Sequence, residues 1–207
     1  RSALTWLVAH DRAAEAIDIG WRLVFFWIIR GRAAEGLRWY EQILNLPSLP
    51  LTVESTALVG AGAMAYSLGE IEHARTALAR ARALACDTGD MAIVATAENL
   101  LGRVEQSLGH VDAAREQYTH SFERYRALGL AWGVGNALTG MATVHLATGD
   151  ATSAERLVDE AISVLRPVAP WFLALALNVR ATLAVRRKDA DEAIAIVRES
   201  LTLIRGL

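Results

Sequence analysis

Residues 102–114 of the chain, GRVEQSLGHVDAA, decide its fold. Gly102 and Ala114 lie twelve positions apart, and Leu108-Gly109-His110 between them has the composition of a turn. Glycine ends a helix in the left-handed conformation without strain. Small residues on both sides of the turn let two antiparallel helices cross closely. The segment therefore predicts a helical hairpin.

The same pattern recurs along the chain, with turn signals at intervals of 38, 40, 40 and 39 residues. Repetition at a fixed period is the signature of stacked repeats. The prediction is an all-α solenoid of about five hairpins with a period of about 38–40 residues. The turns are Arg30-Gly31-Arg32, Leu68-Gly69-Glu70, Leu108-Gly109-His110, Thr148-Gly149-Asp150 and Arg187-Lys188-Asp189, and the flanking pairs are Val24 and Gly36, Gly62 and Ala74, Gly102 and Ala114, Ala142 and Ala154, and Ala181 and Ala193.

Each hairpin is expected to consist of a first helix (the A helix) and a second helix (the B helix). Asp90 and Asp150 are expected N-caps. Residues 1–50 are expected to form an N-terminal hairpin module at a junction with an upstream domain, and residues 51–207 to form four further repeats. The A helices are expected at 12–30, 53–68, 90–108, 131–148 and 170–187, and the B helices at 32–46, 71–87, 111–128, 151–166 and 189–205.

Composition excludes several classes of protein. Of 207 residues, 53% are hydrophobic and 21% charged, which excludes intrinsic disorder. A net charge of −2 argues against a dedicated nucleic-acid surface. The longest apolar run, Leu23 to Ile29, is far shorter than the roughly 20 residues of a membrane span. The single cysteine, Cys86, excludes an internal disulfide and predicts a reducing, cytoplasmic location.

The chain lacks the residue patterns of catalysis and metal binding. It contains no Gly-Lys pair and hence no P-loop. Its histidines show no metalloprotease spacing, and one cysteine cannot form a zinc cluster. The carboxylates are scattered over helix faces opposite the alanines, where solvated residues belong. We therefore expect no enzymatic activity, no metal and no cofactor in these residues.

Aromatic side chains gather in the first hairpin. They favour a dense core against a neighbouring domain, because a helix that is apolar all round is usually buried all round; a ligand-gripping aromatic box is the alternative. Trp132 and Trp171 hold equivalent positions in two A helices, which predicts a structural role between repeats. The first-hairpin aromatics are Trp6, Trp21, Phe25, Phe26, Trp27, Trp39 and Tyr40.

The small-residue pattern resembles that of tetratricopeptide (TPR) repeats. In that family the glycine or alanine of helix A and the alanine of helix B are signature positions, which Gly62 and Ala74 match here, as do their counterparts in the later hairpins. The resemblance implies a right-handed α-solenoid that binds proteins or peptides in its concave groove. The usual period of the family is 34, so the helices of this chain are expected to be longer.

A narrower resemblance covers about the first 40 residues. The segments 3–7, 13–17 and 26–40 resemble a module that follows the STAND-type (NB-ARC-like) ATPase of bacterial regulators and opens their TPR array. Many of these are LuxR-type transcription factors of actinobacteria. The resemblance implies a sensor arm that binds a partner or a small-molecule inducer, with ATPase, cyclase or DNA-binding activity outside this chain.

The A helices line the groove in the TPR family, and projecting the inward-facing positions gives a line of amides, hydroxyls and arginines. A polar peptide or small ligand held by these side chains is one interpretation, and an ordinary wetted groove is the other. The groove has no lysine, unlike the peptide-carboxylate clamp of chaperone-binding TPR proteins. The candidate binding residues are Thr96, Asn99, Arg103, Gln106, Asn136, Thr139, Thr143, Asn178, Thr182 and Arg186.

The last predicted helix is apolar on more than one side, with Ile194, Val197, Leu201, Leu203 and Ile204. Because the end of a repeat array needs a polar outer face, we expect either further repeats or contact with another chain, including self-association. The leading prediction is thus a non-catalytic sensor or interaction domain of a larger bacterial signalling ATPase or transcription regulator. A free-standing adaptor that binds a peptide partner is the alternative.

Overall fold

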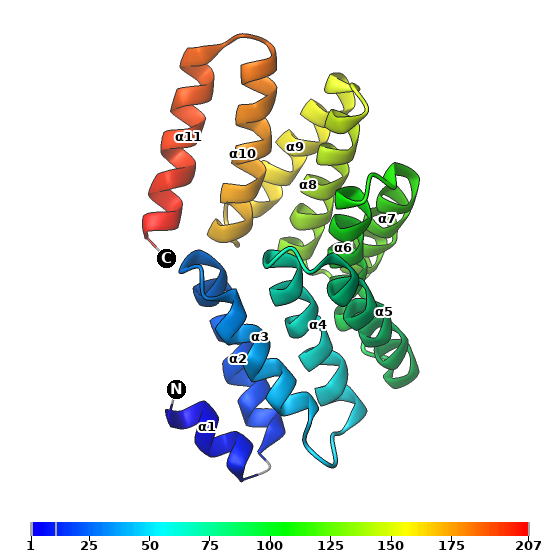
Figure 1. Cartoon of the computed structure of the whole chain (residues 1–207). Helices are drawn as coiled ribbons and strands as arrows, with labels where there is room; N and C mark the ends of the chain where they lie inside the picture. Colours follow the sequence, from blue (N-terminus) through cyan, green and yellow to red (C-terminus); the bar gives the residue numbers. More distant parts are fainter. Residues whose placement is uncertain (1, 11, 207) are drawn as a thin grey trace. The chain divides into compact units, whose positions relative to one another are not determined.

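The computed structural model describes residues 2–10 and 12–206, and within them every regular element is an α-helix (Figure 1). The predicted all-α class is confirmed, and the ten predicted helices agree with observed ones to within a few residues. One helix, α1, was not predicted. The helices are α1 (Ser2–Ala9), α2 (Ala13–Ile29), α3 (Ala33–Leu44), α4 (Leu51–Ser67), α5 (Ile71–Thr88), α6 (Met91–Ser107), α7 (Val111–Ala127), α8 (Ala131–Ala147), α9 (Ala151–Leu165), α10 (Pro170–Arg186) and α11 (Ala190–Arg205).

The helices form two compact units, one ending at Val104 and one beginning at Glu105, so that α6 contributes to both. In the first unit α3 packs on α2 and on α4, and α4 packs on α5. Trp27, Tyr40 and Met64 are buried together in one core that draws on α1 to α6. The predicted boundary after residue 50 remains a prediction.

In the second unit α7 packs on α8, α8 on α9, and α10 on both α8 and α9, while α11 pairs with α10. Its main core contains Leu138, Val158, Leu165 and Leu177 from three consecutive helices. Trp132 of α8 contacts the hairpins before and after its own, which is the structural role predicted for it. Its ring lies 5.0 Å from that of Tyr125 on α7 and stacks on that of Phe172 on α10 at 5.5 Å.

Glycines inside the A helices allow the close crossings predicted from sequence. A Cβ at Gly62 would lie 2.6 Å from Cγ of Leu78, and a Cβ at Gly60 would overlap the Tyr40 ring. In the second unit a Cβ at Gly140 would overlap the ring of Tyr118 in the same way. A Cβ at any of these positions would overlap the neighbouring side chain, which would have to shift.

The turns between helices have the expected left-handed residues. Gly69, Gly109 and Gly149 have positive φ, which glycine adopts without a Cβ penalty. Lys188 takes that conformation at the last turn, with φ +63°, as the one such non-glycine among the described residues. The predicted N-caps are also present: Oδ1 of Asp90 accepts from the Ile93 amide, and Oδ1 of Asp150 from the Ser153 amide.

Candidate functional site

The candidate binding residues all lie on α6, α8 and α10, the predicted A helices of the last three hairpins. Thr96, Asn99 and Arg103 belong to the first unit, and the others belong to the second. The second unit therefore holds most of the set. As a ligand site the set remains a prediction.

Two candidates are buried in helix packing. Asn99 is almost fully buried in α6. Thr139 is buried in α8, where its hydroxyl donates to the Gly135 carbonyl at 2.8 Å. Neither side chain can meet a ligand directly, so the accessible part of the set is smaller than the sequence indicated.

Gln106 forms a polar junction at the C-terminal end of α6. Its Oε1 accepts hydrogen bonds from the Tyr118 hydroxyl at 3.2 Å and from the Thr143 hydroxyl at 2.9 Å. The Thr143 hydroxyl also lies 2.7 Å from the Gly140 carbonyl. These contacts connect α6, α7 and α8, so they give Gln106 and Thr143 a structural role whatever else they bind.

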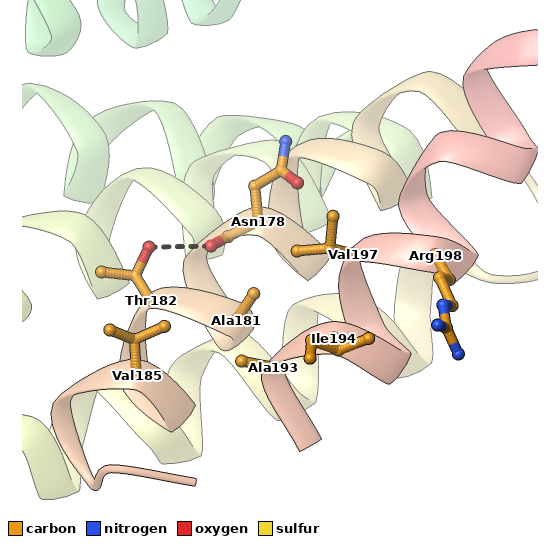
Figure 2. Close-up of a pocket in the computed structure, with 8 residues that line it drawn as sticks. All are labelled: Asn178, Ala181, Thr182, Val185, Ala193, Ile194, Val197 and Arg198. Carbon is orange, nitrogen blue, oxygen red and sulfur yellow. Dashed lines mark hydrogen bonds between the residues drawn. The ribbon is translucent and has the colours of Figure 1, made fainter. Parts of the chain in front are cut away.

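An open cavity of about 450 Å³ lies between α10 and α11 (Figure 2). The candidates Asn178 and Thr182 line one side, where the Thr182 hydroxyl donates to the Asn178 carbonyl at 2.9 Å. Apolar side chains line most of the rest. Arg186, one turn further along α10, instead donates to the Leu146 carbonyl at 2.8 Å. The lining residues are Asn178, Ala181, Thr182, Val185, Ala193, Ile194, Val197 and Arg198.

A charged cluster around Arg180 was not predicted from the sequence. The guanidinium of Arg180 on α10 lies 3.2 Å from Glu155 and 3.0 Å from Asp159, both on α9, and 3.0 Å from Glu192 on α11. Arg187 also pairs with Glu155 and Glu192, and its hydrogen bond to Glu192 raises the pKa of its guanidinium. The available signal was Arg180 as the one charged residue in the stretch 170–185.

The first-hairpin aromatics divide between core and surface. Trp27 and Tyr40 are buried and meet edge-on at 5.9 Å. Trp6, Trp21 and Phe26 are exposed, with Arg12 over the Trp6 ring. The core interpretation thus holds for part of the cluster.

Histidines and carboxylates pair locally. Nδ1 of His73 lies 3.0 Å from Glu70, that of His110 2.7 Å from Glu105, and that of His145 3.1 Å from Asp150, each pair at or near a turn. Among the described residues, no three His, Cys, Asp or Glu side chains converge as metal ligands.

No protein-family model and no curated protein sequence matches the chain. Solved structures do match: BtubC (BKLC) of P. vanneervenii has 15% sequence identity and a TM-score of 0.70, covering 99% of this chain and 87% of that one. A Podosopora anserina protein described as a kinesin light chain with nearly identical TPR-like repeats has 15% identity and a TM-score of 0.59, covering 90% of this chain and 94% of that one.

The fold is that of TPR-like repeat proteins. A Rap protein, solved in complex with Competence and Sporulation Factor, has 11% identity and a TM-score of 0.80, with 95% of this chain and 59% of that one covered. At these identities the likeness establishes the TPR-like fold alone. None of the described helices has the length and apolar composition needed to cross a membrane.

Proposed function

We propose that the chain is a non-catalytic interaction domain whose A-helix surface binds a peptide or protein. The observation that carries this proposal is the open cavity between α10 and α11, which places Asn178 and Thr182 beside apolar side chains. Such a mixture suits a peptide, since apolar surface supplies affinity and a few polar groups fix orientation. The Rap protein of the same fold, solved with its bound factor, supports a peptide ligand.

The proposal extends to the parent protein. The resemblance of the first 40 residues to the module of STAND-type ATPases and LuxR-type regulators supports a sensor arm in a cytoplasmic bacterial regulator. A ligand or inducer would act by binding one state of the attached ATPase more tightly than the other. Sequencing the parent reading frame on both sides tests this: a P-loop upstream supports the regulator, and a start codon directly before residue 1 with a stop after residue 207 supports the adaptor.

Peptide selection tests the binding surface. A displayed random peptide library is selected on the full chain, and the affinity of each selected peptide is measured by fluorescence anisotropy. The double variant Asn136→Ala/Thr182→Val, with changes on α8 and α10, is expected to lose about tenfold in affinity, equivalent to about 1.4 kcal/mol. Thr152→Val/Ser163→Ala, on the exposed face of α9, is the matched control. Equal loss in both variants, or none in either, would place the ligand elsewhere.

A further inference from the structure

The last two hairpins of the chain share one register. Helix α10 begins 39 residues after α8, and α11 begins 39 residues after α9. Helix α10 packs on both α8 and α9. Each residue of the α8–α9 hairpin beneath α10 therefore has a counterpart, 39 positions later, on the α10–α11 hairpin.

Burial differs sharply between counterparts. Leu146 of α8 is 8% exposed, whereas its counterpart Val185 of α10 is 63% exposed. Val158 of α9 is fully buried, whereas Val197 of α11 is 41% exposed. Ile162, partly buried, corresponds to Leu201, which is exposed. The α10–α11 hairpin thus presents apolar side chains at the very positions that a helix covers one hairpin earlier.

The charges differ as well. Arg180 of the covering helix α10 binds Glu155 and Asp159 of α9. Their counterparts on α11 are Ile194 and Arg198. A helix lying on α11 as α10 lies on α9 would meet an apolar side chain and a positive charge in place of two carboxylates. An arginine would be repelled at that place, and an acidic residue would be attracted.

From these two comparisons we infer that the face formed by Val185, Ile194, Val197, Arg198 and Leu201 binds an amphipathic helix of a partner protein. The helix packs as α10 packs on α8 and α9, with an apolar stripe and with an acidic residue opposite Arg198. The inference rests on the proposed function in treating the α10–α11 cavity as a protein-binding site. It adds the class of ligand and the residue that selects it.

Two synthetic helices based on residues 170–186 test the inference, because α10 already covers the equivalent face. One keeps the arginine of position 180 and the other carries Arg180→Glu. A lactam bridge between positions 178 and 182, which α10 exposes, holds each peptide helical, since short isolated helices are marginal in water. Binding to the full chain is measured by NMR from the methyl signals of Ile194, Val197 and Leu201.

The glutamate peptide is expected to bind about fivefold more tightly than the arginine peptide. In the full-chain variant Arg198→Asp this preference should reverse, and Val197→Asp should abolish binding of both peptides. Ala195→Gln is the control, since its counterpart Arg156 is exposed on α9 and a neutral side chain does not pair with Arg198 three residues along the helix. Circular dichroism checks that each variant keeps its helix content.

Three results would overturn the inference. One is that neither peptide shifts the methyl signals at millimolar concentration. Another is that the ratio of the two peptide affinities is the same in the parent chain and in Arg198→Asp. The third is methyl shifts that depend on protein concentration without peptide, which would assign the face to a second copy of the chain. Retained binding of library-selected peptides in Arg198→Asp would leave the proposed function standing while the helix assignment fails.

Discussion

The two units contain the same packing arrangement around Tyr40 and Tyr118, with one chemical difference. Each tyrosine lies on a B helix, and its ring fills the space left by a glycine on the following A helix, Gly60 in the first unit and Gly140 in the second. The Tyr118 hydroxyl donates to Gln106. The Tyr40 hydroxyl is buried without a hydrogen-bond partner among the described residues, and burial raises the pKa of that phenol.

The fit of the tyrosine ring against the glycine occurs in both units, whereas the hydrogen bond of the tyrosine hydroxyl occurs in one. The first and third hairpins share the large ring and the facing glycine, whereas the hairpin between them has Leu78 and Leu100 at the corresponding positions. The hydrogen bond is not carried over, because it depends on Gln106, a residue outside the tyrosine–glycine pair. The shape of this contact therefore recurs in a second hairpin, while its hydrogen bond does not.

The largest expected effect comes from filling the space beside the two rings. Gly60→Ala and Gly140→Ala should each lower the free energy of unfolding of their unit by about 1–3 kcal/mol, because overpacking outweighs the better helix propensity of alanine. Chemical denaturation followed by amide hydrogen exchange in each unit measures this. Stabilisation of either variant would mean that the ring moves aside freely.

Removing the two hydroxyls should have different effects on stability. Tyr118→Phe should cost about 1 kcal/mol, because it deletes a hydrogen bond to Gln106. Tyr40→Phe should leave the free energy of unfolding unchanged or raise it by about 1 kcal/mol, because it removes a buried polar atom without a partner. Equal losses from both substitutions, in the same denaturation experiment, would show that the Tyr40 hydroxyl is satisfied in solution.

Equivalent turns of two successive hairpins differ in the residue at the left-handed position. Lys188 has the positive φ that Gly149 has one hairpin earlier. Lys188→Gly should raise the free energy of unfolding by about 0.5 kcal/mol, because relief of the left-handed strain exceeds the entropy that glycine adds to the unfolded chain. Gly149→Lys is the reciprocal variant and should be destabilising. A loss of stability in Lys188→Gly would contradict the strain.

The smallest effect concerns the cap at Asp150. Hydrogen bonds from Ser153, with a smaller contribution from His145, lower the pKa of this carboxyl. A lowered folded-state pKa gives stability that is present above the unfolded value of about 3.9 and is lost as pH falls through the folded value. Asp150→Ala should therefore lower Tm at pH 6 and approach the parent chain below pH 3.

An asparagine at the same position separates charge from capping. Asp150→Asn keeps a side-chain acceptor for the Ser153 amide, so its Tm should fall less than that of Asp150→Ala at pH 6. The difference in Tm between these two variants should not change between pH 6 and pH 3. A difference that disappeared at low pH would assign the stabilisation to something other than the cap.

The fold could be predicted because it depends on residues that act locally. Gly69, Gly109 and Gly149 end helices by their own backbone freedom, and Asp90 and Asp150 cap the next helix three residues away. Helix bounds followed from these signals. Helix α1 lies before the first turn signal, so the repeat pattern gave no reason to expect it.

The candidate site was less predictable because it depends on side-chain direction. The projection from A helices included Asn99 and Thr139, which a small rotation of the helix turns into the core. It missed Arg180, whose partners come from three different positions on α9 and α11. Pairings between helices cannot be read from a repeat period, since the period fixes spacing and leaves rotation about each helix axis open.

Arg198 has a consequence for the growth of the array by gene duplication. A tandem copy of the α10–α11 hairpin would place the duplicate of Arg180 against Arg198 and Ile194, where Asp159 and Glu155 stand one hairpin earlier. The new junction would carry two like charges and leave the guanidinium without its carboxylates. Lengthening by this route thus requires a compensating substitution at position 198.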